Sequence, residues 1–369
     1  MPLVSLIEAP ESQIEDVAPR KDTRRSVRRG LARIVGFFCL IVIMLFAFNA
    51  MINYGLRHTT TSEFGVWNKI VQGKINTDIL ISGSSRALVH YDPSIIGRAT
   101  GFSAYNIGLN GSQTDMQLAR LRAYLRHNRK PKLLILNFDL FSFVTSHEIY
   151  DPAQYVPYMT EPAIYAGVRR VYPDAWKWKY LPLYGYAVED MRFDWLIGVK
   201  VLFGIQPRED QMNGYRPDDR RWTDDFERFK ANNAKGWSVE IEKQGIIDFA
   251  DTLRTCQEAA IPVLVVHSPE YFEVLEMARN REEILQRAKD LSAEFGSEFW
   301  DYSDSAICRN RGNFYNSQHL NRGGATFFSE DLGTRLFQAG FSRRKGEGEA
   351  KTTAQRLAER VAREVGKID

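Results

Sequence analysis

A serine pair and a distant histidine are the side chains of this sequence best suited to chemistry. Residues 81–86, Ile-Ser-Gly-Ser-Ser-Arg, end a short apolar run that is typical of a buried strand. Residues 316–321, Asn-Ser-Gln-His-Leu-Asn, come at the start of a C-terminal helical pattern. A serine on a turn between a strand and a helix can expose its hydroxyl, and a histidine from another loop can accept its proton. Ser85 and His319 therefore suggest acyl chemistry.

Short apolar runs that alternate with helical patterns predict the framework that positions these two residues. The expected strands are residues 78–81, 104–107, 133–136, 262–266 and 298–302. The expected helices are residues 63–72, 116–125, 241–260, 274–295 and 322–337. Continuous apolar strands separated by helices are typical of a parallel sheet covered on both faces. The sequence therefore predicts an α/β fold with a flavodoxin-like, three-layer, doubly wound parallel sheet.

Residues 146–237 interrupt this alternation with a segment that is rich in tryptophan, tyrosine and proline. A structureless loop of this length is uncommon inside a compact domain. We therefore expect an ordered insertion, packed over the carboxyl ends of the strands, where open α/β sheets bind ligands. Its aromatic side chains would either form a small satellite core or provide surfaces that stack on sugar rings.

Residues 34–54 predict a transmembrane signal anchor. Residues 34–52 are apolar except for Asn49, and at ~1.5 Å per residue they span roughly the hydrocarbon core of a bilayer. The arginines that precede them place the basic tail, residues 1–33, in the cytoplasm. A domain at residues 55–340 would then lie in the periplasm or outside the cell, followed by a charged tail at 341–369. A cleaved signal peptide is the alternative, but the preceding region is unusually long for one.

Charge, cysteine content and motif spacing exclude several other classes of protein. The net charge of +3 comes from basic residues near the two ends, so the folded body has no basic excess for binding nucleic acid. No spacing of histidine, cysteine and acidic residues predicts a metal site, and no glycine motif predicts a nucleotide cofactor. Cys39 falls in the apolar run, Cys256 in a helical pattern, and only Cys256 and Cys308 could pair.

Three segments resemble the sequence blocks of the SGNH/GDSL hydrolase superfamily. Residues 81–86 resemble the first block in its membrane-anchored bacterial form, where Gly-Ser-Ser replaces Gly-Asp-Ser. Residues 106–112, Asn-Ile-Gly-Leu-Asn-Gly-Ser, resemble the second block, and residues 316–321 resemble the last. Members of this form include DltD-like D-alanylation proteins and alginate O-acetylation proteins, which act on cell-surface polymers outside the cytoplasmic membrane. The resemblance covers the framework at 75–145 and 240–340 and is weak over the insertion.

The resemblance implies a role for each residue that matches these blocks. Ser85 would be the nucleophile and His319 its general base. The backbone amide of Ser85 or its neighbour, together with that of Gly111, would stabilise the oxyanion. The family's Gly-x-Asn-Asp block is missing, which leaves Asn137, at the end of the strand 133–136, as a candidate oxyanion donor.

The residue that would orient the histidine departs from the family pattern. Members usually have an aspartate three residues before the histidine, whereas this chain has Asn316. An amide oxygen can orient an imidazole, but it cannot stabilise imidazolium with a full charge. Asp301 or Asp304, a short distance upstream, could take this place instead.

The resemblance thus implies a membrane-anchored esterase or O-acyltransferase of the bacterial inner membrane. It would act through an acyl-enzyme on Ser85, on acyl groups, most simply acetyl, of a cell-surface or exopolysaccharide glycan. A multi-span membrane acyltransferase would be its expected partner. The alternative is a protein that has lost catalysis, as Asn316 would then indicate, and that binds glycan or scaffolds a polysaccharide export or modification complex. The chemical reactivity of Ser85 separates the two.

Overall fold

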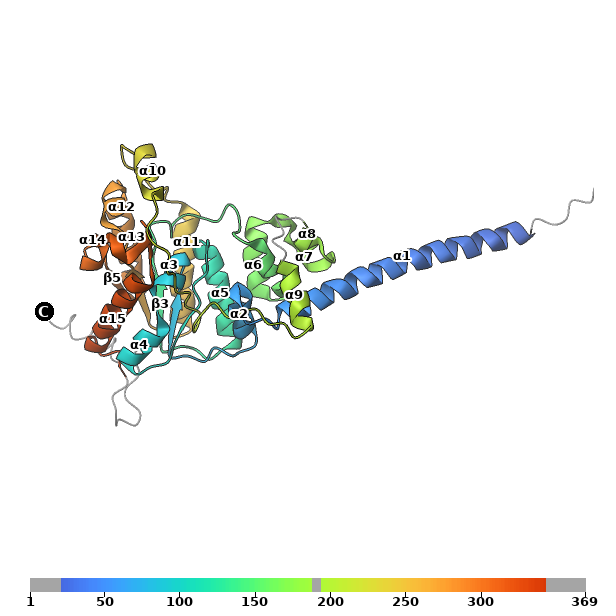
Figure 1. Cartoon of the computed structure of the whole chain (residues 1–369), viewed down its shortest axis with the longest axis horizontal. Helices are drawn as coiled ribbons and strands as arrows, with labels where there is room; N and C mark the ends of the chain where they lie inside the picture. Colours follow the sequence, from blue (N-terminus) through green and yellow to red (C-terminus); the bar gives the residue numbers. More distant parts are fainter. Residues whose placement is uncertain (1–20, 188–193, 343–369) are drawn as a thin grey trace, which may run out of the picture. The chain divides into compact units, whose positions relative to one another are not determined.

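The computed structural model describes residues 21–187 and 194–342, and a five-stranded sheet lies at the centre of the domain (Figure 1). Its strands are β1 (Ile79–Ser82), β2 (Ala104–Asn106), β3 (Leu133–Asn137), β4 (Val263–His267) and β5 (Glu298–Asp301). They follow the order β2-β1-β3-β4-β5, and every neighbouring pair is parallel. This is the flavodoxin-like order, so the predicted fold class is confirmed.

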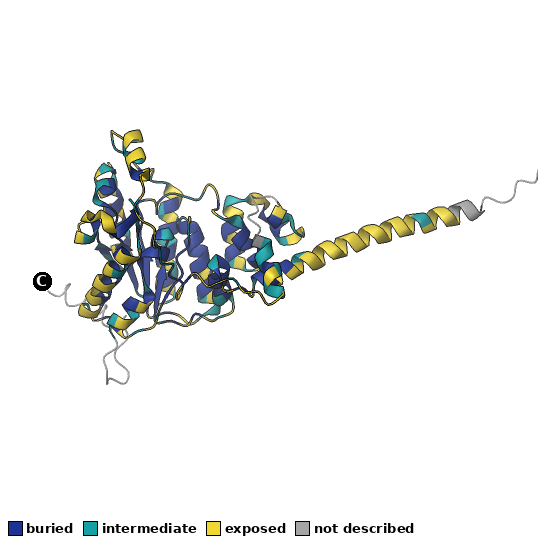
Figure 2. Ribbon diagram, in the orientation of Figure 1, coloured by how far each residue is buried: buried dark blue, intermediate teal, exposed yellow. Residues whose placement is uncertain are grey.

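Helices cover both faces of the sheet. Alternate side chains of a strand point to opposite faces, and the apolar side chains on each face need a helical layer to bury them. Leu80, Leu134 and Val265 belong to the core beneath one helical layer, and their neighbours Ile81 and Val266 belong to the core beneath the other. The first layer holds α5 (Thr114–His127), α11 (Lys243–Glu258) and α13 (Arg281–Glu294), and the second holds α4 (Pro93–Thr100) and α15 (Arg322–Gln338). The strands are accordingly buried on both faces, which explains their continuous apolar sequences (Figure 2).

The prediction of one continuous helix at residues 274–295 is wrong. The structure has two helices there, α12 (Phe272–Met277) and α13. The chain is extended between them because Ala278 pairs with Trp237 in an isolated β-bridge. The side chain of Asn280 also bonds both backbone groups of Val239, at 3.1 and 2.8 Å. These contacts to residues 237–239 replace the helical hydrogen bonds.

Two short helices after β1 have no counterpart in the sequence prediction. They are α3 (Ser85–His90) and α4. The start of α4 carries a recognisable signal, since Asp92 accepts hydrogen bonds from the amides of Ser94 and Ile95 and Pro93 occupies the first turn.

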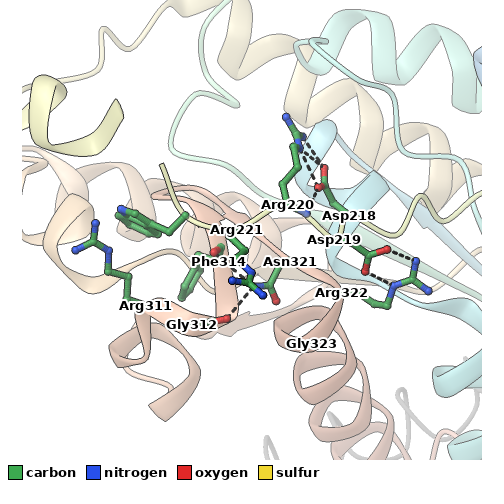
Figure 3. A pocket seen from close by; sticks show the side chains of 11 residues that line it. Asp218, Asp219, Arg220, Arg221, Arg311, Gly312, Phe314, Asn321, Arg322 and Gly323 are labelled. Atoms are coloured by element: carbon green, nitrogen blue, oxygen red, sulfur yellow. Dashed lines mark hydrogen bonds and ion pairs between the residues drawn. The ribbon is translucent and has the colours of Figure 1, made fainter. Parts of the chain in front are cut away.

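The insertion is built mainly from short helices. They are η1 (Pro152–Tyr158), α6 (Pro162–Val171), η2 (Pro173–Ala175), α7 (Trp176–Tyr180), α8 (Tyr184–Ala187), α9 (Asp194–Leu202) and α10 (Asp225–Asn232). Tyr155, Tyr158, Trp178 and Tyr186 are buried among them, and they belong to the same hydrophobic core as Leu80 of the sheet rather than to a separate satellite core. Trp222 differs because it lines a surface hollow, whose other lining residues are labelled in Figure 3.

Most of the insertion does not lie over the carboxyl ends of the strands, and that expectation is corrected. α6 packs against α5, where a Cβ on Gly167 would lie 2.8 Å from that of Ala119. Arg170 of α6 forms a bidentate ion pair with Asp248 of α11, at 2.9 and 2.8 Å. The insertion therefore rests on helices that already cover the sheet. The segment 213–222, which we call the strap, reaches the edge that carries Ser85, where the Arg216 amide donates to the Leu88 carbonyl of α3 at 3.0 Å.

A single long helix, α1 (Lys21–Leu56), precedes the domain (Figure 1). Its part Arg25–Leu56 is long and apolar enough to cross a membrane, a test that an N-terminal signal sequence also passes. From Asn49 onward the helix belongs to the same compact unit as the sheet. There Asn49 accepts a hydrogen bond from the amide of Leu183 at 3.0 Å. The predicted basic tail, residues 1–33, and the predicted charged tail, residues 341–369, lie largely outside the described residues, which leave out 1–20 and 343–369.

Candidate active site

The turn from β1 into α3 presents the Ser85 hydroxyl. Gly83 has a φ of +149°, and a Cβ there would lie 2.8 Å from the Cβ of Asn137, so only glycine lets the chain turn this close to β3. Ser84 caps the helix by accepting the Arg86 amide at 3.1 Å. Ser85 follows as the first helical residue and is partly exposed.

A small hairpin, rather than the start of a helix, presents His319 to that serine. It consists of β6 (Phe314–Asn316) and β7 (His319–Leu320), and α15 begins only at Arg322. The distance between His319 Nε2 and Ser85 Oγ is 2.8 Å. The predicted proximity of the two side chains is therefore confirmed, across more than two hundred residues of sequence.

The Asn316 amide oxygen fixes the tautomer of His319. It accepts the backbone amides of Gln318 and His319, at 3.0 and 2.9 Å, so it must be the oxygen that faces them. The same oxygen lies 2.9 Å from His319 Nδ1. Since a carbonyl oxygen only accepts, Nδ1 carries the proton and Nε2 presents a lone pair to the Ser85 hydroxyl.

The upstream aspartates do not take the place of Asn316. Asp301 accepts hydrogen bonds from the amide and hydroxyl of Ser303, at 3.0 and 2.6 Å, and lies 3.4 Å from Lys289. Asp304 is exposed. The contact to His319 Nδ1 that the sequence left open between three residues is thus made by Asn316.

His90 holds the hairpin in place. The Leu320 amide donates to His90 Nε2 at 3.0 Å, so His90 Nδ1 carries the proton and donates to Ser268 Oγ at 2.9 Å. Burial lowers the pKa of His90 well below its ordinary value, which keeps the ring neutral. Its role is structural, as is that of His267, which donates from Nδ1 to the carbonyl of Phe138 at 3.0 Å.

A buried ionic cluster lies directly behind the serine turn. Arg86 Nη1 is 2.6 Å from Glu270 Oε1 and 2.9 Å from Asp139 Oδ1, and the guanidinium also donates to the Ser268 carbonyl. All three charged residues are buried. Burial raises the pKa of Glu270 to about 7, although Arg86 acts to lower it. The cluster ties α3 to the ends of β3 and β4 and thereby fixes the position of Ser85.

The surroundings of His319 are positively charged. Its ring stacks on Tyr315 with centroids 5.4 Å apart, and the Arg220 guanidinium lies 4.2 Å from the centroid of that tyrosine. Loss of solvent, then the charges of Arg86 and Arg220, lower the pKa of His319 to about 3. The imidazole is therefore neutral, and able to accept a proton, far into the acid range.

We expect esterase activity to persist to unusually low pH if His319 is the general base. An ordinary histidine base is lost near pH 6.5, whereas the lowered pKa of His319 leaves it neutral at pH 5. Asn316→Asp should raise that pKa, because a carboxylate stabilises imidazolium, and should move the acid limb of the rate profile upward. Initial rates of p-nitrophenyl acetate hydrolysis from pH 4 to 8 would show whether the wild-type rate stays level toward pH 4 while the rate of the variant falls. A wild-type limb near pH 6.5 would contradict this account.

The structure gives Gly111 and Asn137, the two other predicted oxyanion residues, no contact with Ser85 or His319 among the hydrogen bonds of the described residues. Gly111 lies in the turn after β2 with a φ of +61°, where a Cβ would be 2.5 Å from the Tyr150 ring. Asn137 Oδ1 accepts from the Tyr91 hydroxyl at 2.7 Å, and its Nδ2 donates to Asp139 Oδ1 at 2.9 Å. Asn137 thus joins the buried cluster behind Ser85.

The backbone amide of Ser85 remains a candidate oxyanion donor. It belongs to the first residue of α3, and the first amides of a helix have no acceptor within it. The amide of Gly108, by contrast, donates to Asn106 Oδ1 at 2.8 Å. Across residues 21–187 and 194–342, no group of three or more histidine, cysteine, aspartate or glutamate side chains could hold a metal ion.

The comparisons with known proteins place this chain among remote structural neighbours only. No protein-family model and no curated protein sequence matches it. A proposed acylhydrolase from Bacteroides fragilis NCTC 9343 aligns at 10% identity with a TM-score of 0.33, over 71% of this chain and 85% of that one. A family two carbohydrate esterase from Clostridium thermocellum, solved with cellohexaose, aligns at 11% identity with a TM-score of 0.32, over 72% and 66%. At such similarity these proteins do not inform the chemistry, which depends on the site itself.

Proposed function

We propose that this protein is a serine esterase or O-acyltransferase of the SGNH type, acting on acyl groups of a cell-surface or exopolysaccharide glycan. The observation that carries the proposal is the continuous series of hydrogen bonds from Ser85 Oγ through His319 to Asn316. Three of the superfamily's sequence blocks are resembled in the same order, although the Gly-x-Asn-Asp block is missing and Asn316 stands where the usual residue is aspartate. The series ends on a partly exposed serine, so a substrate can reach it.

The geometry supports a two-step acyl transfer. Ser85 Oγ attacks the acyl carbonyl carbon while its proton passes to His319 Nε2. In this mechanism the Ser85 amide stabilises the tetrahedral oxyanion. Collapse expels the sugar oxygen, which takes the proton from Nε2 and leaves an acyl ester on Ser85. Water or an acceptor hydroxyl then attacks that ester, with His319 again taking and returning the proton.

Asn316 makes this a weaker catalyst than an aspartate would. Its oxygen holds the imidazole in the correct tautomer, but it adds no negative charge beside the imidazolium that forms during the reaction. In the serine protease that serves as the reference case, a carboxylate-to-amide change lowers turnover about 10⁴-fold because it leaves the histidine in the wrong tautomer, so the loss expected here is smaller. Slow transfer of an acyl group, rather than rapid hydrolysis, suits such a site.

The proposed setting is the outer side of the bacterial inner membrane. Residues 34–54 would anchor the chain and residues 55–340 would face the periplasm, with a multi-span acyltransferase as the supplier of the acyl group. The long apolar helix α1 supports this placement by its length and composition. The alternative is a scaffold or glycan-binding protein without catalysis, and it predicts an unreactive Ser85.

Covalent labelling with a fluorophosphonate probe tests the proposal directly. A serine hydrogen-bonded to a neutral histidine should react with the probe, whereas an ordinary surface serine should not. We expect one labelled peptide, carrying the probe on Ser85, and no labelling after Ser85→Ala or heat denaturation. Wild-type protein that stays unlabelled, while a known serine esterase is labelled in the same tube, would leave the scaffold alternative.

A further inference from the structure

The insertion exposes an apolar patch on α7 and at the residue that follows it. Trp176 and Tyr180 are four residues apart, so they share one face of the helix, whereas Trp178 lies on the other face and is buried. Trp176 is 43% exposed, Tyr180 is 58% exposed and Leu181 is 41% exposed. We call these three residues the apolar patch. Two large rings and a leucine exposed together indicate a surface with a binding partner.

Two lysines border the apolar patch. Lys177 Nζ lies 5.8 Å from the Trp176 ring centroid, and Lys179 Nζ lies 5.4 Å from that of Tyr180. Asp174 pairs with Lys177 at 2.6 Å, but Lys179 forms no ion pair among the described residues. The patch therefore joins aromatic rings to a net positive charge, a combination typical of surfaces that meet lipid headgroups.

The loop after the apolar patch is bonded to the end of α1. The Leu183 amide donates to Asn49 Oδ1 at 3.0 Å. Because Leu181 is only two residues from Leu183 along the chain, it lies within roughly 10 Å of Asn49. The Tyr186 hydroxyl donates to Asn53 Oδ1 at 2.5 Å. All of these contacts lie within the compact unit that starts at Asn49.

Helix α9 holds the same segment of α1 through a second contact. The two backbones meet at Gly55 and Gly198, where a Cβ on Gly55 would lie 1.9 Å from the carbonyl oxygen of Gly198. The insertion is thus attached to residues 49–55 by side-chain hydrogen bonds and by direct backbone packing. The position of the apolar patch relative to residues 49–55 is consequently fixed.

The apolar run of α1 ends within this same segment. The run covers residues 34–52, and Tyr54, which is 58% exposed, follows it. In the membrane setting proposed above, residues 34–52 occupy the hydrocarbon core, and the outer headgroup layer begins at about residues 49–55. The insertion therefore holds the apolar patch near the depth at which tryptophan and tyrosine gather in membrane proteins.

We propose that the apolar patch binds the outer leaflet of the membrane that α1 crosses, with its rings among the lipid headgroups and Lys177 and Lys179 beside anionic lipid phosphates. The proposal rests on the membrane setting proposed above and adds a second contact between the chain and the lipid. A phospholipid surface is the partner that matches, because it offers apolar acyl chains and negative charge together at the end of the apolar run.

This contact gives the insertion a role away from the serine–histidine pair. Lys179 Nζ lies 4.6 Å from the ring centroid of Tyr165, which belongs to α6. Arg170 of α6 pairs with Asp248 of α11, at 2.9 and 2.8 Å, and α11 covers the sheet. An apolar patch seated on the membrane thus holds the sheet, and with it Ser85, in one orientation to the lipid surface.

Quenching of a fluorescent label by nitroxide lipids tests the contact in the full-length protein. Leu181→Cys in a Cys39→Ser background would carry an NBD label in nanodiscs of phosphatidylethanolamine and phosphatidylglycerol, since the other two cysteines are buried. Ala47→Cys marks the apolar run, and Phe337→Cys, at an exposed aromatic residue of α15, is the matched control. We expect a nitroxide near the headgroup to reduce emission at least about twofold at positions 47 and 181, because an interfacial side chain lies ~5–10 Å into the headgroup boundary. Emission at position 337 should not change.

The same label tests the two lysines. Lys177→Gln combined with Lys179→Gln should reduce the quenching at position 181, because it removes the attraction to anionic lipid. Replacing phosphatidylglycerol with phosphatidylcholine should have the same effect on the parent protein. Lys235→Gln combined with Lys243→Gln, at exposed lysines outside α7, is the matched control and should leave the quenching unchanged.

The outcomes separate this contact from the anchor and from the chemistry. Quenching at position 47 with none at position 181 would overturn the lipid contact, keep the anchor and assign the apolar patch to a protein partner. No quenching at either position would reject the anchor and the contact together. Equal losses in the two lysine pairs would overturn the role of the charges. The reactivity of Ser85 is measured separately, so a protein that resists the fluorophosphonate can still show the lipid contact.

Discussion

Ser85→Ala should lower the rate of ester hydrolysis by at least about 10³-fold, because it removes the hydroxyl proposed to attack the acyl carbon. Ser85 Oγ is 2.8 Å from His319 Nε2, and the tautomer of that histidine leaves a lone pair there to take its proton. Among the described residues, Ser85 is the hydroxyl that contacts His319 Nε2. Rates with p-nitrophenyl acetate, and with an acetylated oligosaccharide, would measure the loss.

Two further variants make the result interpretable. His319→Ala should lose nearly as much as Ser85→Ala, and the double variant should lose little more, because residues that act as one unit are not additive. Ser84→Ala removes the neighbouring hydroxyl, which caps α3, so it should cost about 1 kcal/mol of stability and retain most of the activity. Equal rates in Ser84→Ala and Ser85→Ala would show that the measured hydrolysis does not come from this site.

The framework and the pair at its centre could be predicted from sequence for a physical reason. Strands buried on both faces have continuous apolar sequences, so the positions of β1, β3 and β4 are visible without a structure. The carboxyl ends of parallel strands meet at one edge, which brings the turn after β1 near the loop before the last helix. The Ser85–His319 contact follows from those two facts.

The supporting residues could not be found in this way, because their partners depend on strand order. Arg86 meets Asp139 and Glu270 only because β1 lies beside β3 and β3 beside β4. No local pattern links residues so far apart in the chain. The break before α13 also has its cause elsewhere, in Trp237 of the insertion. The unpredicted helix α4 did carry a usable sequence signal, because an aspartate that caps the helix and a proline in the first turn mark its start.

Arg86→Met should destabilise the fold by about 3–5 kcal/mol, because it leaves two buried carboxylates without their cation. Arg86 is buried and lies 2.6 Å from Glu270 and 2.9 Å from Asp139. Chemical denaturation of the full chain, followed by tryptophan fluorescence, would measure the change. Arg254→Met, which removes an exposed arginine of a surface ion pair, is the matched control and should change stability by less than about 1 kcal/mol.

The loss in Arg86→Met should also depend on pH, in a direction set by Glu270. Burial raises the pKa of Glu270 to about 7, so the stability that its protonated form contributes is present below its ordinary pKa and is lost as the pH rises through 7. Removing Arg86 takes away the charge that lowers this pKa, so the variant should lose more stability at pH 8 than at pH 5. Adding Glu270→Gln to Arg86→Met should recover part of the loss at pH 8 and little at pH 5. A loss that is equal at both pH values would mean that the ionisation of Glu270 does not contribute, and that Arg86 acts through packing and its hydrogen bond to Ser268 instead.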